Sequence, residues 1–354
     1  MILTEATVAN NNSTLQGPKS WPVQVYITTI TAIVSLFSTS VIFVTYIAWK
    51  DYRSTSRRIL CYISVADFLL AVCFLFGTWR SDHEKNDLTC KIQACVSTCA
   101  YLWSLLWTTF LAVFMFTTVA KKERRKAEIM LKFFHVFGWG IPLIIAGTAF
   151  KLDKFGSNYD ILTPGWCFID ERLPRNDLQL WLWLTGISWD VTAYILVSVF
   201  YLMLKCHIRN QILHQKNLFP SQEIKNIVLK ADRMLTFVPI VFFLLRFCGT
   251  LRCIVCLYTD AVKSRPWWNK MLLYLQAFGD GSQGFANFLL FCVFTEQFQT
   301  RLRRSAQKLF VCCPLPIQRK LLDNSRYSGE ETPMIESQSS LNGIHYNNYE
   351  TCAE

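Results

Sequence analysis

Five charged side chains stand inside otherwise apolar stretches of the sequence. Three are acidic and two are basic: Asp67, Asp190, Asp280, Arg246 and Arg252. If these stretches span a membrane, each isolated charge costs about 2.5–3.5 kcal/mol on insertion scales. We therefore expect the five side chains to face a protein interior and to find partners there, as buried ion pairs or hydrogen-bonded centres.

The depth of each charge in its stretch predicts its partner. Asp190 and Arg246 each lie about twelve residues from the same end of their helices, which is about 18 Å at 1.5 Å per residue. Consecutive antiparallel helices pack together, so we expect Arg246 to pair with Asp190, with Asp280 as the competing partner. Asp67 is expected to form a separate polar centre with Asn287, holding an ion or water. The buried pair could be a latch between helices or a purely structural contact.

The fourteen cysteines do not form a single framework. Cys90 and Cys167 lie in segments predicted to be extracellular, where a disulfide is favoured over two reduced thiols. Cys312 and Cys313 follow the last apolar stretch and are suited to palmitoylation. Eight others fall inside apolar stretches, where cysteine behaves as a small hydrophobic residue: Cys61, Cys73, Cys95, Cys99, Cys248, Cys253, Cys256 and Cys292.

Several kinds of chemistry lack the residues they need. No CxxC pair is accompanied by suitably placed histidines, so no metal site is predicted. The clustered His and Asp of a seven-helix hydrolase are missing, and no lysine lies within the last predicted helix for a retinal Schiff base, since Lys270 is at its edge. The net charge of +11 comes from basic residues beside the apolar stretches, as membrane topology requires. We expect no enzyme, no cofactor and no nucleic-acid partner.

The composition indicates a polytopic membrane protein. The chain is 52% hydrophobic and only 17% charged, whereas soluble domains carry about a quarter charged residues. The apolar residues are gathered in blocks longer than the 18 or so that span a bilayer. Seven blocks predict an all-α fold, a seven-transmembrane helix bundle, with helices near 23–49, 58–79, 90–120, 129–150, 178–204, 233–258 and 270–294.

The predicted organisation has four parts and one orientation. The N-terminal segment 1–21 is expected to be extracellular, and Asn11 and Asn12 begin overlapping glycosylation sequons in it. With this end outside the plasma membrane, the inner segments carry about twice as many Lys and Arg as the outer ones. The bundle then occupies 22–295, a short amphipathic membrane-surface helix 296–313, and a disordered cytoplasmic tail 314–354.

Short segments spread over the predicted helices carry a resemblance in combination. They are 57–60, 64–67, 133–142, 165–170, 189–190 and 283–287, together with Arg246. The chain resembles a G-protein-coupled receptor of the cyclic-AMP-receptor-like group over nearly the whole membrane region and neither tail. It lacks the acidic-Arg-aromatic and Asn-Pro-x-x-Tyr motifs of rhodopsin-like receptors, since 117–121 and 286–290 read TTVAK and ANFLL. The switch residues of that group therefore cannot be assigned here.

The resemblance implies a receptor that catalyses nucleotide exchange on a heterotrimeric G protein in response to an unknown agonist. Basic residues at the inner helix ends would border a cavity for a G-protein helix: Arg57, Arg58, Lys121, Lys122, Arg124, Arg125, Arg209, Lys225, Arg233 and Arg301. They could instead be only topology anchors that contact membrane lipids. Tail serines and threonines are either phosphorylation sites that recruit arrestin or a solvated linker. The alternative function, a transporter or channel, lacks the expected internal repeat.

Overall fold

The computed structural model describes residues 22–49, 54–80, 87–157, 162–214, 222–259 and 266–311. The chain divides into two compact units, residues up to Gln299 and residues from Thr300 onward. The first unit contains the helix bundle, and the second begins within the last helix. Asn11, Asn12, Cys312 and Cys313 lie outside the described residues.

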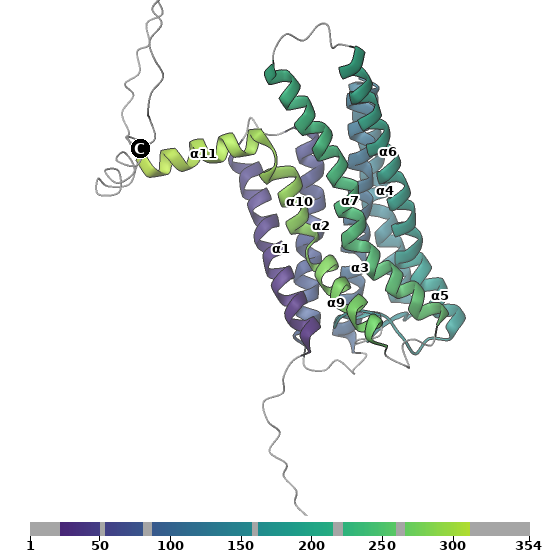
Figure 1. Ribbon diagram of the computed structural model, residues 1–354. Coiled ribbons are helices and arrows are strands. Elements are labelled where there is room, and N and C mark those ends of the chain that lie inside the picture. Colours follow the sequence, from purple (N-terminus) through teal and green to yellow (C-terminus); the bar gives the residue numbers. More distant parts are fainter. Residues whose placement is uncertain are drawn as a thin grey trace, which may run out of the picture. The chain divides into compact units, whose positions relative to one another are not determined.

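The first unit is a bundle of long helices that run side by side (Figure 1). Its helices are α1 (Val23–Ala48), α2 (Thr55–Thr78), α3 (Leu88–Met115), α4 (Arg124–Lys151), α5 (Arg175–Leu182), α6 (Ser188–His214), α7 (Gln222–Tyr258), α9 (Trp267–Gly281) and α10 (Gln283–Phe288). Three π-helical turns extend them, at Phe116–Ala120, Trp183–Ile187 and Leu289–Val293. The helix α11 (Glu296–Val311) falls in the predicted amphipathic segment.

Packing between helices closes the bundle into a ring. The helix α3 contacts α2, α4 and α6, and it is therefore the central element. The ring continues from α6 to α7 and from α7 to α9, and α9 and α10 return to α1. A short antiparallel pair of strands, β1 (Phe155–Gly156) and β2 (Phe168–Ile169), lies in the loop after α4, where the sequence analysis expected no strand.

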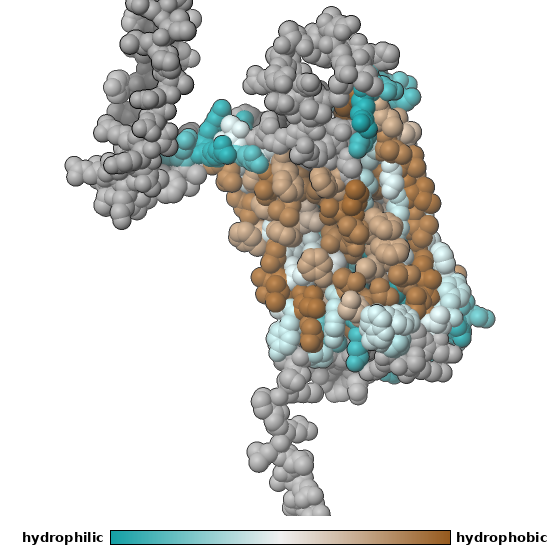
Figure 2. Space-filling model, in the orientation of Figure 1, coloured by the Kyte–Doolittle hydropathy of each residue, from teal (hydrophilic) through white to brown (hydrophobic). Residues whose placement is uncertain are grey.

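The bundle is apolar on its outside, unlike a water-soluble protein, and it buries many polar side chains among its apolar core residues. In α1 the side chains of Thr28 and Thr39 are fully buried, whereas Ile30 and Phe37 are 62% and 69% exposed. Figure 2 shows the apolar belt around the bundle, with hydrophilic residues near its ends. Within the described ranges, six helical stretches are long and apolar enough to cross a membrane. A multi-pass membrane protein is the architecture in which such a surface is stable.

The seventh predicted helix is present but is not continuous. It consists of α9, a break at Ser282, α10 and a π-helical turn, so no single piece reaches the length of a membrane span. The break is held by Ser35 of α1, whose hydroxyl accepts a hydrogen bond of 3.0 Å from the backbone N–H of Gly284. Glycines at this break let the backbone approach its neighbours. A Cβ on Gly279 would overlap the carbonyl oxygen of Leu245 in α7.

We expect Gly279→Ala to lower the thermal stability of the purified protein. The added methyl group meets backbone atoms of Leu245, which cannot move away as a side chain could, and overpacking of this kind costs about 1–3 kcal/mol. The matched control is Gly147→Ala in α4, where a Cβ would find no atom within 4 Å. Equal melting temperatures for the two variants would contradict the close packing of α9 on α7.

Other helix ends also differ from the prediction, and α4 and α7 illustrate the reason. The helix α4 begins at Arg124 and so includes part of the basic cluster that was expected to precede it. The chain turns sharply before it, at Lys122, whose φ is 56°. The helix α7 begins at Gln222 rather than near 233. In both cases a polar segment continues the helix beyond the apolar block. Hydropathy locates the part of a helix that lies in the membrane, and it does not locate the residue at which the helix begins.

Candidate functional site

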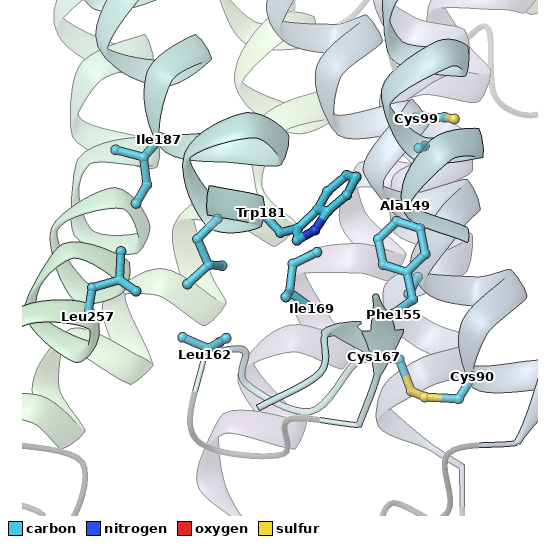
Figure 3. Close-up of a cluster of buried hydrophobic side chains, with 13 residues drawn as sticks. Cys90, Cys99, Ala149, Phe155, Leu162, Cys167, Ile169, Trp181, Ile187 and Leu257 are labelled. Atoms are coloured by element: carbon cyan, nitrogen blue, oxygen red, sulfur yellow. A yellow bond between two sulfur atoms is a disulfide. The ribbon is translucent and has the colours of Figure 1, made fainter. Parts of the chain in front are cut away.

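A disulfide between Cys90 of α3 and Cys167 fastens the loop that contains the two strands, as predicted. The two Cα atoms are 5.6 Å apart (Figure 3). Asp87 is the N-cap of α3, and its carboxylate accepts a hydrogen bond of 2.8 Å from the backbone N–H of Cys90. This hydrogen bond lowers the pKa of Asp87. We call the end of the bundle that carries this bond the disulfide end.

Further contacts fix the same loop over the bundle. The backbone N–H of Cys167 donates to the side-chain oxygen of Gln93 in α3 at 2.9 Å. The indole of Trp166 stacks on Phe74 of α2, with ring centroids 3.9 Å apart. On the other side, the amide of Gln276 in α9 donates to the carbonyl of Leu162 at 3.1 Å. The loop is thus a lid held on α2, α3 and α9.

A cavity of about 70 Å³ lies beneath this lid. Side chains from α2, α3, α6, α7 and α9 form its walls, and Thr163, Trp166 and Phe168 of the lid segment border it. Most of the lining is apolar or aromatic, and two carboxylates, those of Asp190 and Asp280, belong to it. A concave apolar site with a few polar groups is the usual form of a small-molecule site.

Asp190 and Arg246 lie close together but do not form the predicted ion pair. The described residues contain no salt bridge of Arg246 with Asp190 or Asp280. Instead, both carboxylate oxygens of Asp190 accept hydrogen bonds from neutral hydroxyls, of Tyr101 at 2.6 Å and of Thr250 at 2.8 Å. The guanidinium of Arg246 lies over the Tyr101 ring, 4.4 Å from its centroid. The direct pairing was therefore wrong because an aromatic ring stands between the two charges.

Ser104 joins Arg246 to the second polar centre. The Nη2 of Arg246 donates to the Ser104 hydroxyl at 3.2 Å, and this hydroxyl donates to Asp67 at 2.6 Å. The amide of Asn287 donates to the other oxygen of Asp67 at 2.7 Å. Asp67 and Asn287 meet in one polar centre, as predicted, but the centre is not separate, since one hydroxyl connects it to Arg246. An ion or water held there stays a prediction.

Arg252 is the remaining buried cation. Its side chain is 1% exposed. Its Nε donates to the side-chain oxygen of Asn269 at 3.1 Å, and its Nη1 donates to the side-chain oxygen of Gln276 at 2.9 Å. Because Gln276 also holds the lid, Arg252 is tied to the lid through one amide side chain.

A second cavity, of about 360 Å³, lies toward the opposite end of the bundle. Residues of α2, α3, α6 and α7 line it, together with the π-helical turn after α10. Arg57 lines this cavity and donates a hydrogen bond to the carbonyl of Phe291 in that turn. Asn287 precedes Phe291 by one helical turn, so side-chain contacts and one turn of helix together connect the first cavity to Arg57.

Of the other basic residues predicted at this end, none whose side chain the structure describes lines the second cavity. Arg58, Lys121, Lys122, Arg125 and Arg209 have exposed side chains. Arg124, Lys225 and Arg233 lie in helices, and their side chains fall outside the described part of the structure. Arg301 lies in α11, in the second unit. Arg57 is therefore the predicted residue that the cavity contains.

The sequence analysis missed the uncharged side chains that complete the site. Tyr101, Ser104, Thr250 and Gln276 each contact a buried charge. Their signal in the sequence was a polar group inside an apolar stretch, which is the same signal that singled out the charges. Among the described residues, no group of three or more His, Cys, Asp or Glu side chains could hold a metal ion.

Comparisons with known proteins identify relatives over most of this architecture. A family model described as 7 transmembrane receptor (Secretin family) matches residues 22–246. G-protein coupled receptor 157 of Mus musculus is 30% identical over 288 residues, which is 80% of this chain and 84% of that protein. Its Homo sapiens counterpart is 30% identical over 273 residues, 76% of this chain and 79% of that protein. Cyclic AMP receptor-like protein A of Dictyostelium discoideum is 25% identical over 134 residues, 37% of this chain and 32% of that protein.

Proposed function

Because the chain belongs to the secretin family of 7 transmembrane receptors and is a G-protein-coupled receptor rather than an enzyme, we propose a route by which it transmits its signal. An agonist enters the cavity beneath the lid, and a heterotrimeric G protein docks at the cavity of the opposite end. The single observation that supports this route is the chain of contacts through Asp190, Arg246, Asp67 and Asn287 to Arg57.

The chain of contacts joins helices that can move relative to one another. Arg246 belongs to α7, Ser104 to α3 and Asp67 to α2, while Asn287 belongs to the interrupted helix that follows α9. An agonist that changes the position of α7 would alter the Arg246–Ser104 hydrogen bond first, and the seventh helix and the Phe291–Arg57 contact would follow. A ligand shifts the populations of two states only through such differential contacts.

In the proposed orientation the receptor spans the plasma membrane and its disulfide end faces the outside of the cell. A disulfide persists in an oxidising compartment, which supports this orientation. The exposed Arg58, Lys121, Lys122 and Arg125 at the opposite end would then face the cytoplasm, in accordance with the positive-inside rule. The proposal has three further parts. Arrestin binds the phosphorylated tail, palmitoyl groups on Cys312 and Cys313 contact membrane lipids, and glycans are attached to Asn11 and Asn12.

Nucleotide exchange on purified heterotrimeric G proteins tests this function, with the receptor in nanodiscs. We expect the charge reversal Lys121→Glu with Lys122→Glu and Arg125→Glu to reduce exchange by at least about tenfold, because a docked partner would lose its complementary charge. The matched control is Lys151→Glu, an exposed charge at the disulfide end of α4.

Two outcomes would count against the proposal. If the reversed variant inserts with unchanged topology and retains full exchange, these residues only anchor the helices. If the receptor activates no heterotrimer but carries a solute across proteoliposome membranes, the transporter alternative gains support.

A further inference from the structure

Among the residues that the structure describes, those in the wall of the cavity beneath the lid carry negative charge and no positive charge. Asp190 and Asp280 line it, whereas none of its lining residues is Lys or Arg. Arg246 and Arg252 are buried nearby, but their side chains lie outside the lining. We propose that this cavity binds a small organic cation, a protonated amine carried on an apolar or aromatic body. This proposal rests on the proposed receptor function and names the chemical class of its agonist.

The count of charges in the bundle favours a cationic ligand. Among the described residues, the fully buried charged side chains are Asp67, Asp190, Arg246 and Arg252, two of each sign. Asp280 is half-buried in the cavity wall and is the fifth, so the group has one negative charge in excess. A charge in a membrane interior is costly without a partner. One protonated amine in the cavity would balance the group.

The two carboxylates in the wall have different roles. Both oxygens of Asp190 already accept hydrogen bonds, from Tyr101 and Thr250. Asp280 has no salt bridge with any Lys or Arg in the part of the chain that the structure describes. Asp280 is thus the carboxylate that a ligand ammonium group would contact, and Asp190 adds negative potential beside it.

An unpaired hydroxyl faces the same space. Thr98 of α3 lines the cavity, its side chain is 1% exposed, and its oxygen has no hydrogen-bond partner among the described residues. A threonine in a helix normally donates to a carbonyl in the preceding turn, as Thr108 and Thr109 do in the same helix. A buried polar group without a partner costs about 1–3 kcal/mol. A ligand N–H would satisfy this oxygen.

Aromatic rings supply the rest of the recognition. Phe74, Tyr101, Trp166 and Phe168 line the cavity, and the faces of aromatic rings attract cations. Arg246 already uses the Tyr101 ring in this way, at 4.4 Å, from outside the cavity. The cavity of about 70 Å³ is smaller than the roughly 150 Å³ that holds a benzene ring. An amine with an aromatic body would therefore have to shift the lid and its contact between Trp166 and Phe74 as it binds.

An isosteric series tests the sign of the charge. The full-length receptor in nanodiscs is melted with 2-phenylethylamine, 2-phenylethanol or 3-phenylpropionate, which carry a cation, a neutral hydroxyl and an anion on the same aromatic body. We expect the amine alone to raise the melting temperature, by an amount that grows as its concentration increases to about 10 mM, where even weak fragments bind. Stabilisation by the anion, or equal effects of all three compounds, overturns the proposal.

The Asp280→Asn variant locates the site. It removes the charge with little change of shape, and we expect the apparent affinity for 2-phenylethylamine to fall by at least about tenfold. Glu128→Gln is the matched control, because Glu128 is an exposed carboxylate of α4 that neither lines the cavity nor belongs to the buried charged group. Each variant is compared with its own ligand-free melting temperature. An equal loss in both variants overturns the assignment, and if Asp280→Asn does not fold, the series on the natural receptor decides alone.

Nucleotide exchange is measured separately with the same amine. Binding without exchange would support the cavity assignment and contradict the proposed coupling. Exchange driven by another ligand, with no binding of the amine, would leave the receptor function standing and overturn the assignment.

Discussion

Replacing both Cys90 and Cys167 with Ala is expected to lower the free energy of unfolding by at most roughly 4–5 kcal/mol. The bond closes a loop of 77 residues, and the chain-entropy model gives this magnitude for a loop of that length. The loop includes α3 and α4, which remain helical in the membrane, so the entropy released on reduction is smaller than for a soluble chain. The double replacement avoids leaving one free thiol.

The expected loss also depends on the contacts that remain. Lys154 and Asp177 form a salt bridge of 2.7 Å across the loop. Lys91 of α3 forms another, of 2.5 Å, with Asp153. Both involve partly exposed side chains, and such pairs contribute little, about 0–1 kcal/mol. The lid should therefore loosen when the disulfide is removed. We expect the affinity for an agonist to fall, whereas the helix content should change little.

Melting of the purified receptor, with circular dichroism for helix content, checks this expectation. The control is Cys206→Ala, an exposed free cysteine in α6, which should melt like the natural receptor. A melting temperature that is unchanged in the Cys90→Ala, Cys167→Ala receptor would contradict a stabilising disulfide. Loss of stability in the control would point to a general effect of cysteine removal.

The sequence predicted those features that depend on hydropathy and on position along the chain. Long apolar blocks located the helices, and cysteines at the outer ends of their segments located the disulfide. Depth placed Asp190 and Arg246 near each other, which the structure confirms. Hydropathy could not predict the break at Ser282, because that depends on glycine contacts with α1 and α7.

The sequence could not predict which atoms satisfy the buried charges. Depth along a helix says nothing about rotation around it, so Tyr101 could not be placed between Arg246 and Asp190. For the same reason Asp67 was predicted to lie in a centre separate from Arg246, although the Ser104 hydroxyl joins the two side chains. The two strands within the lid were not predicted, since each has only two residues.

Replacing Arg246 with Met is expected to have the largest effect on both folding and signalling. The side chain is 2% exposed, and its loss leaves Asp67 and Asp190 without the guanidinium beside them. Breaking a buried charged contact in this way costs about 3–5 kcal/mol, because the remaining charge stays buried. We expect a marked fall in melting temperature and in the amount of receptor at the cell surface.

A second replacement separates charge balance from signalling. Arg246→Met with Asp190→Asn removes one charge of each sign, so much of the lost stability should return. If the double variant is no more stable than Arg246→Met alone, the loss is one of packing against Tyr101 and Phe242 rather than of charge.

The signalling effect is best seen in a variant that keeps every charge. Ser104→Ala removes the hydroxyl that joins Arg246 to Asp67 and should cost about 1–3 kcal/mol, because two buried charged groups each lose a hydrogen bond. Because α7 then loses its hydrogen bond to α3, we expect nucleotide exchange without agonist to rise, measured at equal surface density. The control is Thr109→Ala, a buried hydroxyl of the same helix that bonds only to its own backbone, at Leu105. Basal exchange that is the same in both variants would show that Arg246 is a structural contact and not a latch.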